Sequence, residues 1–141
     1  SSGCGGSGNC CIQECPGGNC PTCQSGCSCD LLCDGVSNCQ ATCAAGSACH
    51  LYGNSSNTVV VAADGALAYV ECNSVDNCTL NCRAGSYCDL FCNSVLSSCT
   101  LACDAASVCL LECNSSTCQL TGCDQPRSCP NGVTVCRREC P

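Results

Sequence analysis

The stretch CNSVDNCTLNCRAGSYCDLFC, residues 72–92, has cysteines separated alternately by five and by three residues. Each three-residue interval has an apolar residue at its centre, as in CTLNC (78–82) and CDLFC (88–92). Successive side chains of a β-strand point to opposite faces, so both cysteines and the central leucine of each unit point the same way. The stretch therefore predicts two short strands joined by turns, each strand with one cysteine-lined face.

The same five-residue unit recurs along most of the chain, and two units with their two turns repeat about every twenty residues. A single strand of this length cannot bury its inner face, but stacked coils can. We therefore predict an all-β, disulfide-stapled two-sided β-solenoid (β-helix) with about 20 residues per coil. It spans residues 29–129, between a Cys/Gly-rich N-terminal segment (1–28) and a Cys/Arg-rich C-terminal tail (130–141).

Composition places the protein among disulfide scaffolds. Cysteine accounts for 26 of the 141 residues, tryptophan and methionine are absent, and Phe91 is the only phenylalanine. Disulfides persist in oxidising compartments, and neither a leader at Ser1 nor an apolar run of membrane-spanning length is evident, so we expect a mature extracellular protein without a membrane span. The net charge of −7 disfavours nucleic acid as a partner.

The degenerate copies of the unit indicate how the cysteines pair. Gly53 and Thr58 replace the two cysteines that flank one turn, and Ala62 and Ala68 replace those that flank the next. Paired losses across a turn favour bridges that close turns over bridges between coils or across a coil. The predicted bridges are Cys33–Cys39, Cys43–Cys49, Cys72–Cys78, Cys82–Cys88, Cys92–Cys99, Cys103–Cys109, Cys113–Cys118 and Cys123–Cys129, the last on the assumption of a one-residue slip.

Towards the chain ends the spacing is less regular. The same rule extends to Cys4–Cys10, Cys15–Cys20 and Cys23–Cys29. Cys11, Cys27, Cys136 and Cys140 are then left over, for two further bridges or for links between molecules.

Neither a metal centre nor an active site is indicated. Metal sites favour close spacings such as Cys-x2-Cys, which occurs once, at Cys20 to Cys23. The only histidine, His50, is predicted to point outward beside Tyr52, and the carboxylates are scattered over outward positions. We therefore expect no cofactor, no metal and no enzymatic activity.

The outward positions of one predicted sheet carry the aromatic residues, and those of the other are rich in threonine. These side chains are either ordinary strand aromatics or an interaction patch, and the sequence favours neither interpretation. Candidate interface residues are Leu32, Tyr52, Val59, Val61, Tyr69, Phe91, Arg137 and Arg138. Sequons at Asn54, Asn77 and Asn114 fall in turns along one edge, where glycans would be accessible.

Two resemblances follow from these patterns. The Cys-x3-Cys-x5-Cys alternation over residues 29–129 resembles cysteine-rich repeats of secreted myxobacterial and protist proteins, a likeness that implies secretion and no particular activity. Short cysteine-stapled coils with outward threonines, such as Thr100 and Thr121, resemble the insect ice-binding β-solenoids, which implies ice binding.

Function is predicted from the ends of the solenoid. No helical or charged cap is evident, and three of the four arginines lie in residues 121–141, after an acidic body. Uncapped solenoid ends favour head-to-tail stacking. We therefore expect a non-enzymatic structural protein that assembles with itself into a filament. The alternative is a monomeric binding module for ice, carbohydrate or a cell-surface partner.

Overall fold

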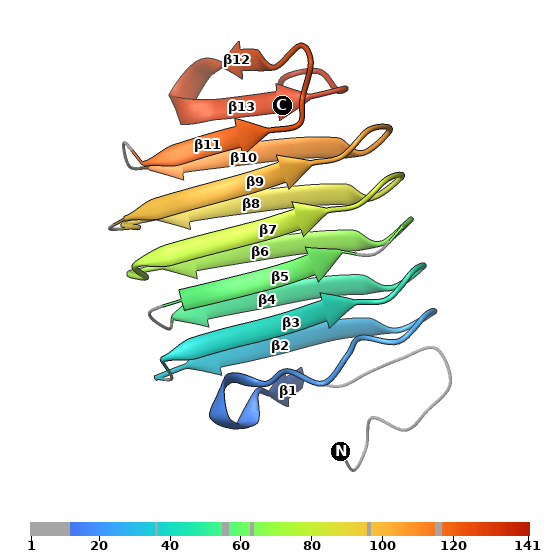
Figure 1. Ribbon diagram of the computed structural model, residues 1–141, viewed down its shortest axis with the longest axis vertical. Helices are drawn as coiled ribbons and strands as arrows, with labels where there is room; N and C mark the ends of the chain where they lie inside the picture. Colours follow the sequence, from blue (N-terminus) through green and yellow to red (C-terminus); the bar gives the residue numbers. More distant parts are fainter. Residues whose placement is uncertain (1–11, 36, 55–56, 63, 96, 115–116) are drawn as a thin grey trace.

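The computed structural model describes residues 12–141 except for 36, 55–56, 63, 96 and 115–116 (Figure 1). Its strands stack in two parallel layers and form the predicted β-solenoid, with about 20 residues per coil. Sheet A contains β2 (Ser28–Asp34), β4 (Ala48–Asn54), β6 (Leu67–Asn73), β8 (Tyr87–Asn93) and β10 (Val108–Asn114). Sheet B contains β3 (Asn38–Cys43), β5 (Asn57–Ala62), β7 (Asn77–Cys82), β9 (Ser98–Cys103) and β11 (Cys118–Thr121).

The predicted alternation of side chains explains the core. In β2, Cys29, Leu31 and Cys33 are buried while Asp30 is exposed. Parallel in-register pairing then stacks the central residue of each unit into one apolar column per sheet. The column of sheet A is Leu31, Leu51, Val70, Leu90 and Leu111, and that of sheet B is Ala41, Val60, Leu80, Leu101 and Leu120.

Most of the predicted bridges are present and close turns of the coil. The structure pairs Cys15–Cys20, Cys23–Cys29, Cys33–Cys39, Cys43–Cys49, Cys72–Cys78, Cys82–Cys88, Cys92–Cys99, Cys103–Cys109 and Cys113–Cys118. Cys27 is a buried free thiol. The predicted Cys4–Cys10 bridge and the unassigned Cys11 lie outside the described residues.

Residues 53–68 contain no cysteine, and other side chains fill the positions that cysteines occupy in the neighbouring coils. Gly53 stands in register with Cys33, and Thr58 stands in register with Cys39. Thr58 is 1 % exposed, and a Cβ added at Gly53 would lie only 2.9 Å from its hydroxyl oxygen. The glycine therefore leaves the space that Thr58 fills, which explains why the two cysteines of this turn are replaced together.

The predicted bridge Cys123–Cys129 is wrong. Cys123 pairs with Cys136, and Cys129 pairs with Cys140, so Cys136 and Cys140 are not left over. The physical reason is a change of direction in the chain. The strand β13 (Val133–Cys136) runs antiparallel to β10 and places Cys136 opposite Cys109, so residues 123–129 do not close another turn of the solenoid.

The two ends of the solenoid differ (Figure 1). At the N-terminal end, β1 (Ile12–Glu14) pairs parallel to β2, and isolated bridges join Asn19 and Cys23 to β3. The 3₁₀ turn η1 (Pro16–Gly18) lies between β1 and Asn19 in the chain. Part of the predicted N-terminal segment, from residue 12 onward, therefore continues the solenoid.

At the C-terminal end, β12 (Arg127–Cys129), η2 (Pro130–Gly132) and β13 form a hairpin at the edge of sheet A. Leu110, which the strand pattern places on the outer face, is buried there with Val133 and Val135. The sequence suggested no helical or charged cap at this end, and the structure instead has this hairpin covering the edge of β10 in sheet A.

Candidate functional site

The outer face of sheet A brings aromatic and acidic side chains into two rows. The second residue of each five-residue unit forms one row, and the fourth residue forms the other. The first row is Asp30, His50, Tyr69, Asp89 and Leu110, and the second is Leu32, Tyr52, Glu71, Phe91 and Glu112. The predicted gathering of aromatic residues on one sheet is therefore present.

A groove of about 370 Å³ runs across β2, β4, β6 and β8 beside the first row. The polar wall is part of the first row, where Asp30, His50, Tyr69 and Asp89 stand in register. The other wall is mainly apolar and is the row two residues earlier in each strand; it includes Leu67 and Tyr87, whose exposed fractions are 53 % and 52 %. The volume of the groove lies at the lower end of the range typical of small-molecule sites.

Leu67 and Tyr87 were not among the candidate interface residues. Each lies directly before the first position of its unit, at the junction of turn and strand. Extending the strand alternation by one residue would have placed both on the outer face.

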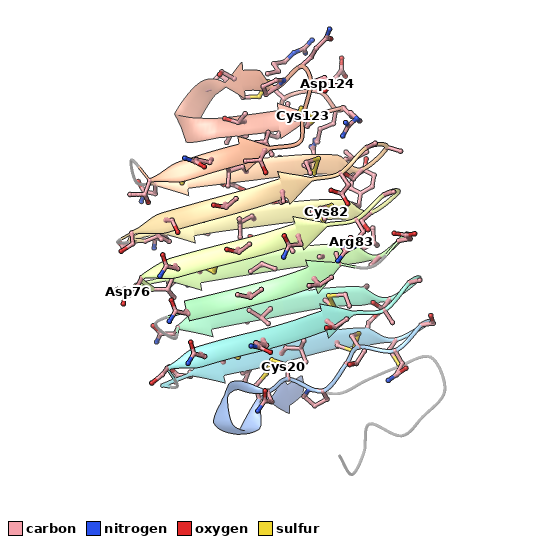
Figure 2. The ribbon with its side chains drawn as sticks, viewed as in Figure 1. Cys20, Asp76, Cys82, Arg83, Cys123 and Asp124 are labelled. Carbon is pink, nitrogen blue, oxygen red and sulfur yellow. A yellow bond between two sulfur atoms is a disulfide. The ribbon has the colours of Figure 1, made fainter. Side chains whose placement is uncertain are left out.

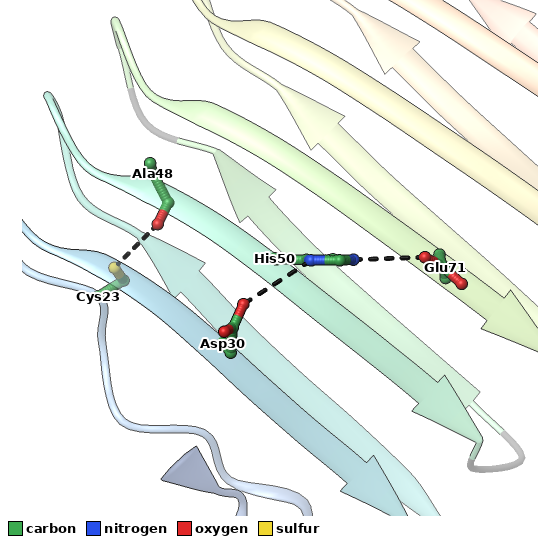
Figure 3. A network of polar contacts seen from close by, with 5 residues as sticks. All are labelled: Cys23, Asp30, Ala48, His50 and Glu71. Atoms are coloured by element: carbon green, nitrogen blue, oxygen red, sulfur yellow. Dashed lines mark hydrogen bonds and ion pairs between the residues drawn. The ribbon is translucent and has the colours of Figure 1, made fainter. Parts of the chain in front are cut away.

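His50 is the centre of the polar wall (Figure 3). Its ring centroid lies 4.3 Å from that of Tyr52 and 4.6 Å from that of Tyr69. Its Nδ1 is 3.7 Å from an oxygen of Asp30, and its Nε2 is 3.3 Å from an oxygen of Glu71. Both ring nitrogens therefore face carboxylates on neighbouring strands, which fixes the ring between two aromatic side chains.

The electrostatic field of this face is negative. Burial, and to a lesser extent the negative charges of Glu71, Asp89 and Glu112, together raise the pKa of the Tyr69 phenol to about 12. Burial and the neighbouring Glu112 raise the pKa of Asp89 to about 6, although the positive charge of Arg138 lowers it. The Oδ1 atom of Asp89 is buried and has no hydrogen-bond partner among the described residues.

No family model, curated protein or solved structure matches this chain. Function therefore has to be inferred from the geometry of the molecule itself, and the two resemblances drawn from the sequence stay predictions.

The outer face of sheet B has no comparable side chains. It carries Gln40, Thr79, Thr100 and Gln119 in one row, with Val59, 40 % exposed, among them. The second row is Thr42, Val61, Asn81, Ala102 and Thr121. The threonines thus lie in two different rows. Thr79 and Thr100 are neighbours in the first row, and three other residues separate Thr42 from Thr121 in the second, so neither row is a continuous threonine array.

The candidate glycosylation sites belong to hydrogen-bonded ladders along one edge of the solenoid. In each, the Nδ2 of the sequon asparagine donates to a side-chain oxygen one coil below, so the amide that would carry a glycan is already engaged. Such ladders satisfy polar groups at the turns. The donor–acceptor pairs are Asn54–Asp34 at 2.9 Å, Asn77–Asn57 at 2.8 Å and Asn114–Asn93 at 3.0 Å.

The two candidate arginines have different surroundings. The guanidinium of Arg137 donates to the backbone oxygens of Asp104 and Ser107, at 3.1 and 3.0 Å. It therefore fastens the C-terminal tail to the last complete coil. Arg138 instead lines the groove on sheet A.

Within the described part of the chain, sulfur atoms gather closely at Cys15, Cys20, Cys33 and Cys39 and again at Cys78, Cys92 and Cys99. Every one of these cysteines belongs to a disulfide. Metal ligation needs thiolates, so these clusters are stacked bridges in the oxidised protein. Stacking of coils explains their proximity without a metal.

Proposed function

We propose that the protein is a non-enzymatic extracellular binding module and that its binding surface is the outer face of sheet A. The observation that carries this proposal is the groove of about 370 Å³, with its aromatic and carboxylate walls. The many disulfides are typical of an oxidising, extracellular environment, and they hold the strands that form the groove. A binding surface on a rigid scaffold loses little conformational entropy when a ligand binds.

A binding role accounts for more of the structure than filament assembly does. End-to-end stacking was expected because the sequence shows no cap, but the hairpin β12–β13 occupies the C-terminal end of sheet A. Its outer strand β12 has three residues, and very short edge strands are poor templates for pairing.

Of the described residues, none belongs to a helix long and apolar enough to cross a membrane.

A structural explanation also exists for the residues that would carry catalysis. The ring nitrogens of His50 face Asp30 and Glu71, and its ring packs against Tyr52 and Tyr69. General base catalysis needs a nucleophile or a substrate proton within reach of the imidazole. The contacts of His50 instead serve to shape one wall of the groove.

A ligand screen with two matched variants tests the proposal. Neutral oligosaccharides, organic anions and organic amines are added to the oxidised protein, and binding is detected by saturation-transfer NMR of the ligand signals. Tyr87→Ala removes a half-exposed side chain from the groove, and Val59→Ala removes a similarly exposed apolar side chain from sheet B. We expect at least one ligand class to bind, with the signal weakened by Tyr87→Ala and unchanged by Val59→Ala.

Two results would contradict this function. One is binding that is insensitive to Tyr87→Ala, which would place the ligand elsewhere. The other is the absence of ligand binding together with uniform filaments in electron micrographs of the oxidised protein, which would return the function to self-assembly.

A further inference from the structure

We infer that the groove on sheet A binds an organic cation, an ammonium or guanidinium group carried on an apolar stem. The inference rests on the proposed function and names the ligand class of the same site. Its basis is the combination of carboxylates on one wall, apolar and aromatic side chains on the other, and a cation of the protein's own at one end.

The charge of the groove favours a cation. Asp30 and Asp89 line it, and Glu71, next to His50, belongs to the same outer face. The side chain of Asp30 is 52 % exposed, so a ligand can reach its carboxylate directly. Arg138 is the only arginine among the lining residues, and the chain contains no lysine. A negatively charged cleft concentrates cations and disfavours anionic ligands.

The opposite wall suits the apolar part of such a ligand. Leu67 and Tyr87 are each about half exposed, and Tyr69, in the same row as Asp30 and Asp89, adds an aromatic ring on the facing wall. An alkyl stem laid against these side chains would remove apolar surface from water. A cation held within about 6 Å of a tyrosine ring also gains a cation–π attraction.

Arg138 supplies a cation of the protein itself to the lining of the groove. It reaches the groove from the C-terminal tail, and its positive charge lowers the pKa of Asp89. The guanidinium therefore lies near the β8 end, while at the β2 end Asp30 faces no arginine and has Nδ1 of His50 at 3.7 Å. An external cation would bind at that second end.

The dimensions favour an elongated ligand. From β2 to β8 the groove crosses three strand spacings, which amounts to about 14 Å. A stem of several methylene groups fits this length better than a compact ion does. The same chemistry occurs in a free linear polyamine and in the lysine side chain of a basic peptide.

Isothermal titration calorimetry of the oxidised full chain distinguishes these sources. The probes are spermidine as the free polyamine, an acetylated tri-lysine peptide, and maltotriose as a neutral ligand. Asp30→Asn removes the accessible carboxylate, and Asp76→Asn is the matched control. Figure 2 shows Asp76 in a turn at the left edge of the solenoid, and Asp76 is not among the residues that line the groove.

We expect the amines to bind and maltotriose not to bind. Asp30→Asn should weaken amine binding about two- to fivefold, as expected for loss of one partly exposed charge interaction, and Asp76→Asn should leave it unchanged. Raising the salt concentration from 20 to 500 mM should weaken amine binding to the parent protein, because salt screens the attraction between charges. Tighter binding of the peptide would identify a protein partner, and tighter binding of spermidine a free polyamine.

Three results would overturn the inference. Equal weakening by Asp30→Asn and Asp76→Asn would mean nonspecific attraction to an acidic protein. Binding of maltotriose alone, lost in Tyr87→Ala, would refute the cation but leave the proposed binding function standing. The absence of binding by every probe and by every ligand of the wider screen would refute the cation, and uniform filaments found in addition would refute the proposed binding function as well.

Discussion

The two outer faces of this solenoid rest on nearly the same inner structure and yet differ in chemistry. Inside, Leu90 of sheet A and Leu101 of sheet B occupy equivalent columns and are both 0 % exposed. Outside, sheet A carries a groove lined by aromatic and acidic side chains, while sheet B carries threonines among uncharged glutamine, asparagine, valine and alanine side chains. The comparison teaches that the inner positions specify the fold, whereas the outer positions are free to acquire function.

The largest expected effect tests the shared inner structure. Leu90→Ala and Leu101→Ala each leave a cavity in a buried column, which typically costs 2–5 kcal/mol, so we expect a loss of about 3 kcal/mol in both. Guanidinium unfolding with disulfides intact measures the free energy of unfolding. A loss well below 1 kcal/mol in only one variant would mean that the two columns are not equivalent.

The bridges that close the turns should have the next largest effect. Replacing Cys82 and Cys88 together by serine should cost about 2 kcal/mol, because the closed loop is short and restricts the unfolded chain only moderately. The matched variant that should add a bridge is Gly53→Cys with Thr58→Cys, at positions in register with Cys33 and Cys39. We expect it to form a bridge by mass spectrometry and to stabilise the protein. Failure of these cysteines to pair would contradict the explanation of this turn.

The free energy of unfolding should depend on pH through Asp89, which lies on the outer face of sheet A. Its pKa is about 6 in the fold and near 3.8 when unfolded, so its ionisation destabilises the fold above pH 6, and this penalty disappears as the pH falls from 6 towards 4. Asp89→Asn should therefore stabilise the protein at pH 7, by about 1 kcal/mol once solvent screening of this half-buried group is allowed for. The difference between variant and parent should shrink towards pH 4. A difference independent of pH would contradict this origin.

The smallest effect is expected on sheet B. Thr100→Tyr adds a bulky side chain to the flat outer face and should change stability by no more than about 0.5 kcal/mol and leave amine binding unchanged. The same variant tests the ice-binding resemblance, which predicts thermal hysteresis in the parent that is lost in Thr100→Tyr together with Thr121→Tyr. Hysteresis in the parent that disappears in this double variant would make sheet B the functional face.

Local sequence patterns were sufficient to predict the repeating part of the fold. Alternation of side chains identified the buried triplet Cys29, Leu31 and Cys33, and paired losses at Gly53 and Thr58 identified bridges that close turns. Both depend on residues close together in the chain. The register of His50 with Asp30 follows from the same repeat length.

The C-terminal hairpin and the groove were not predictable in this way. Six positions separate Cys123 from Cys129, as in the turns of the solenoid, so spacing alone could not reveal that β13 reverses direction. Its pairing with β10 depends on contacts between distant residues, including burial of Leu110 against Val135. The groove likewise needs Arg138 brought from the tail to the side chains of β8.

The most direct test of the functional difference between the two faces is an amide chemical-shift map of the isotope-labelled protein titrated with spermidine. We predict saturable shifts confined to sheet A, strongest near Asp30, His50 and Tyr69, while the amides of Thr79 and Thr100 on sheet B stay in place. Shifts on sheet B, or shifts spread evenly over both sheets, would contradict the assignment of function to sheet A.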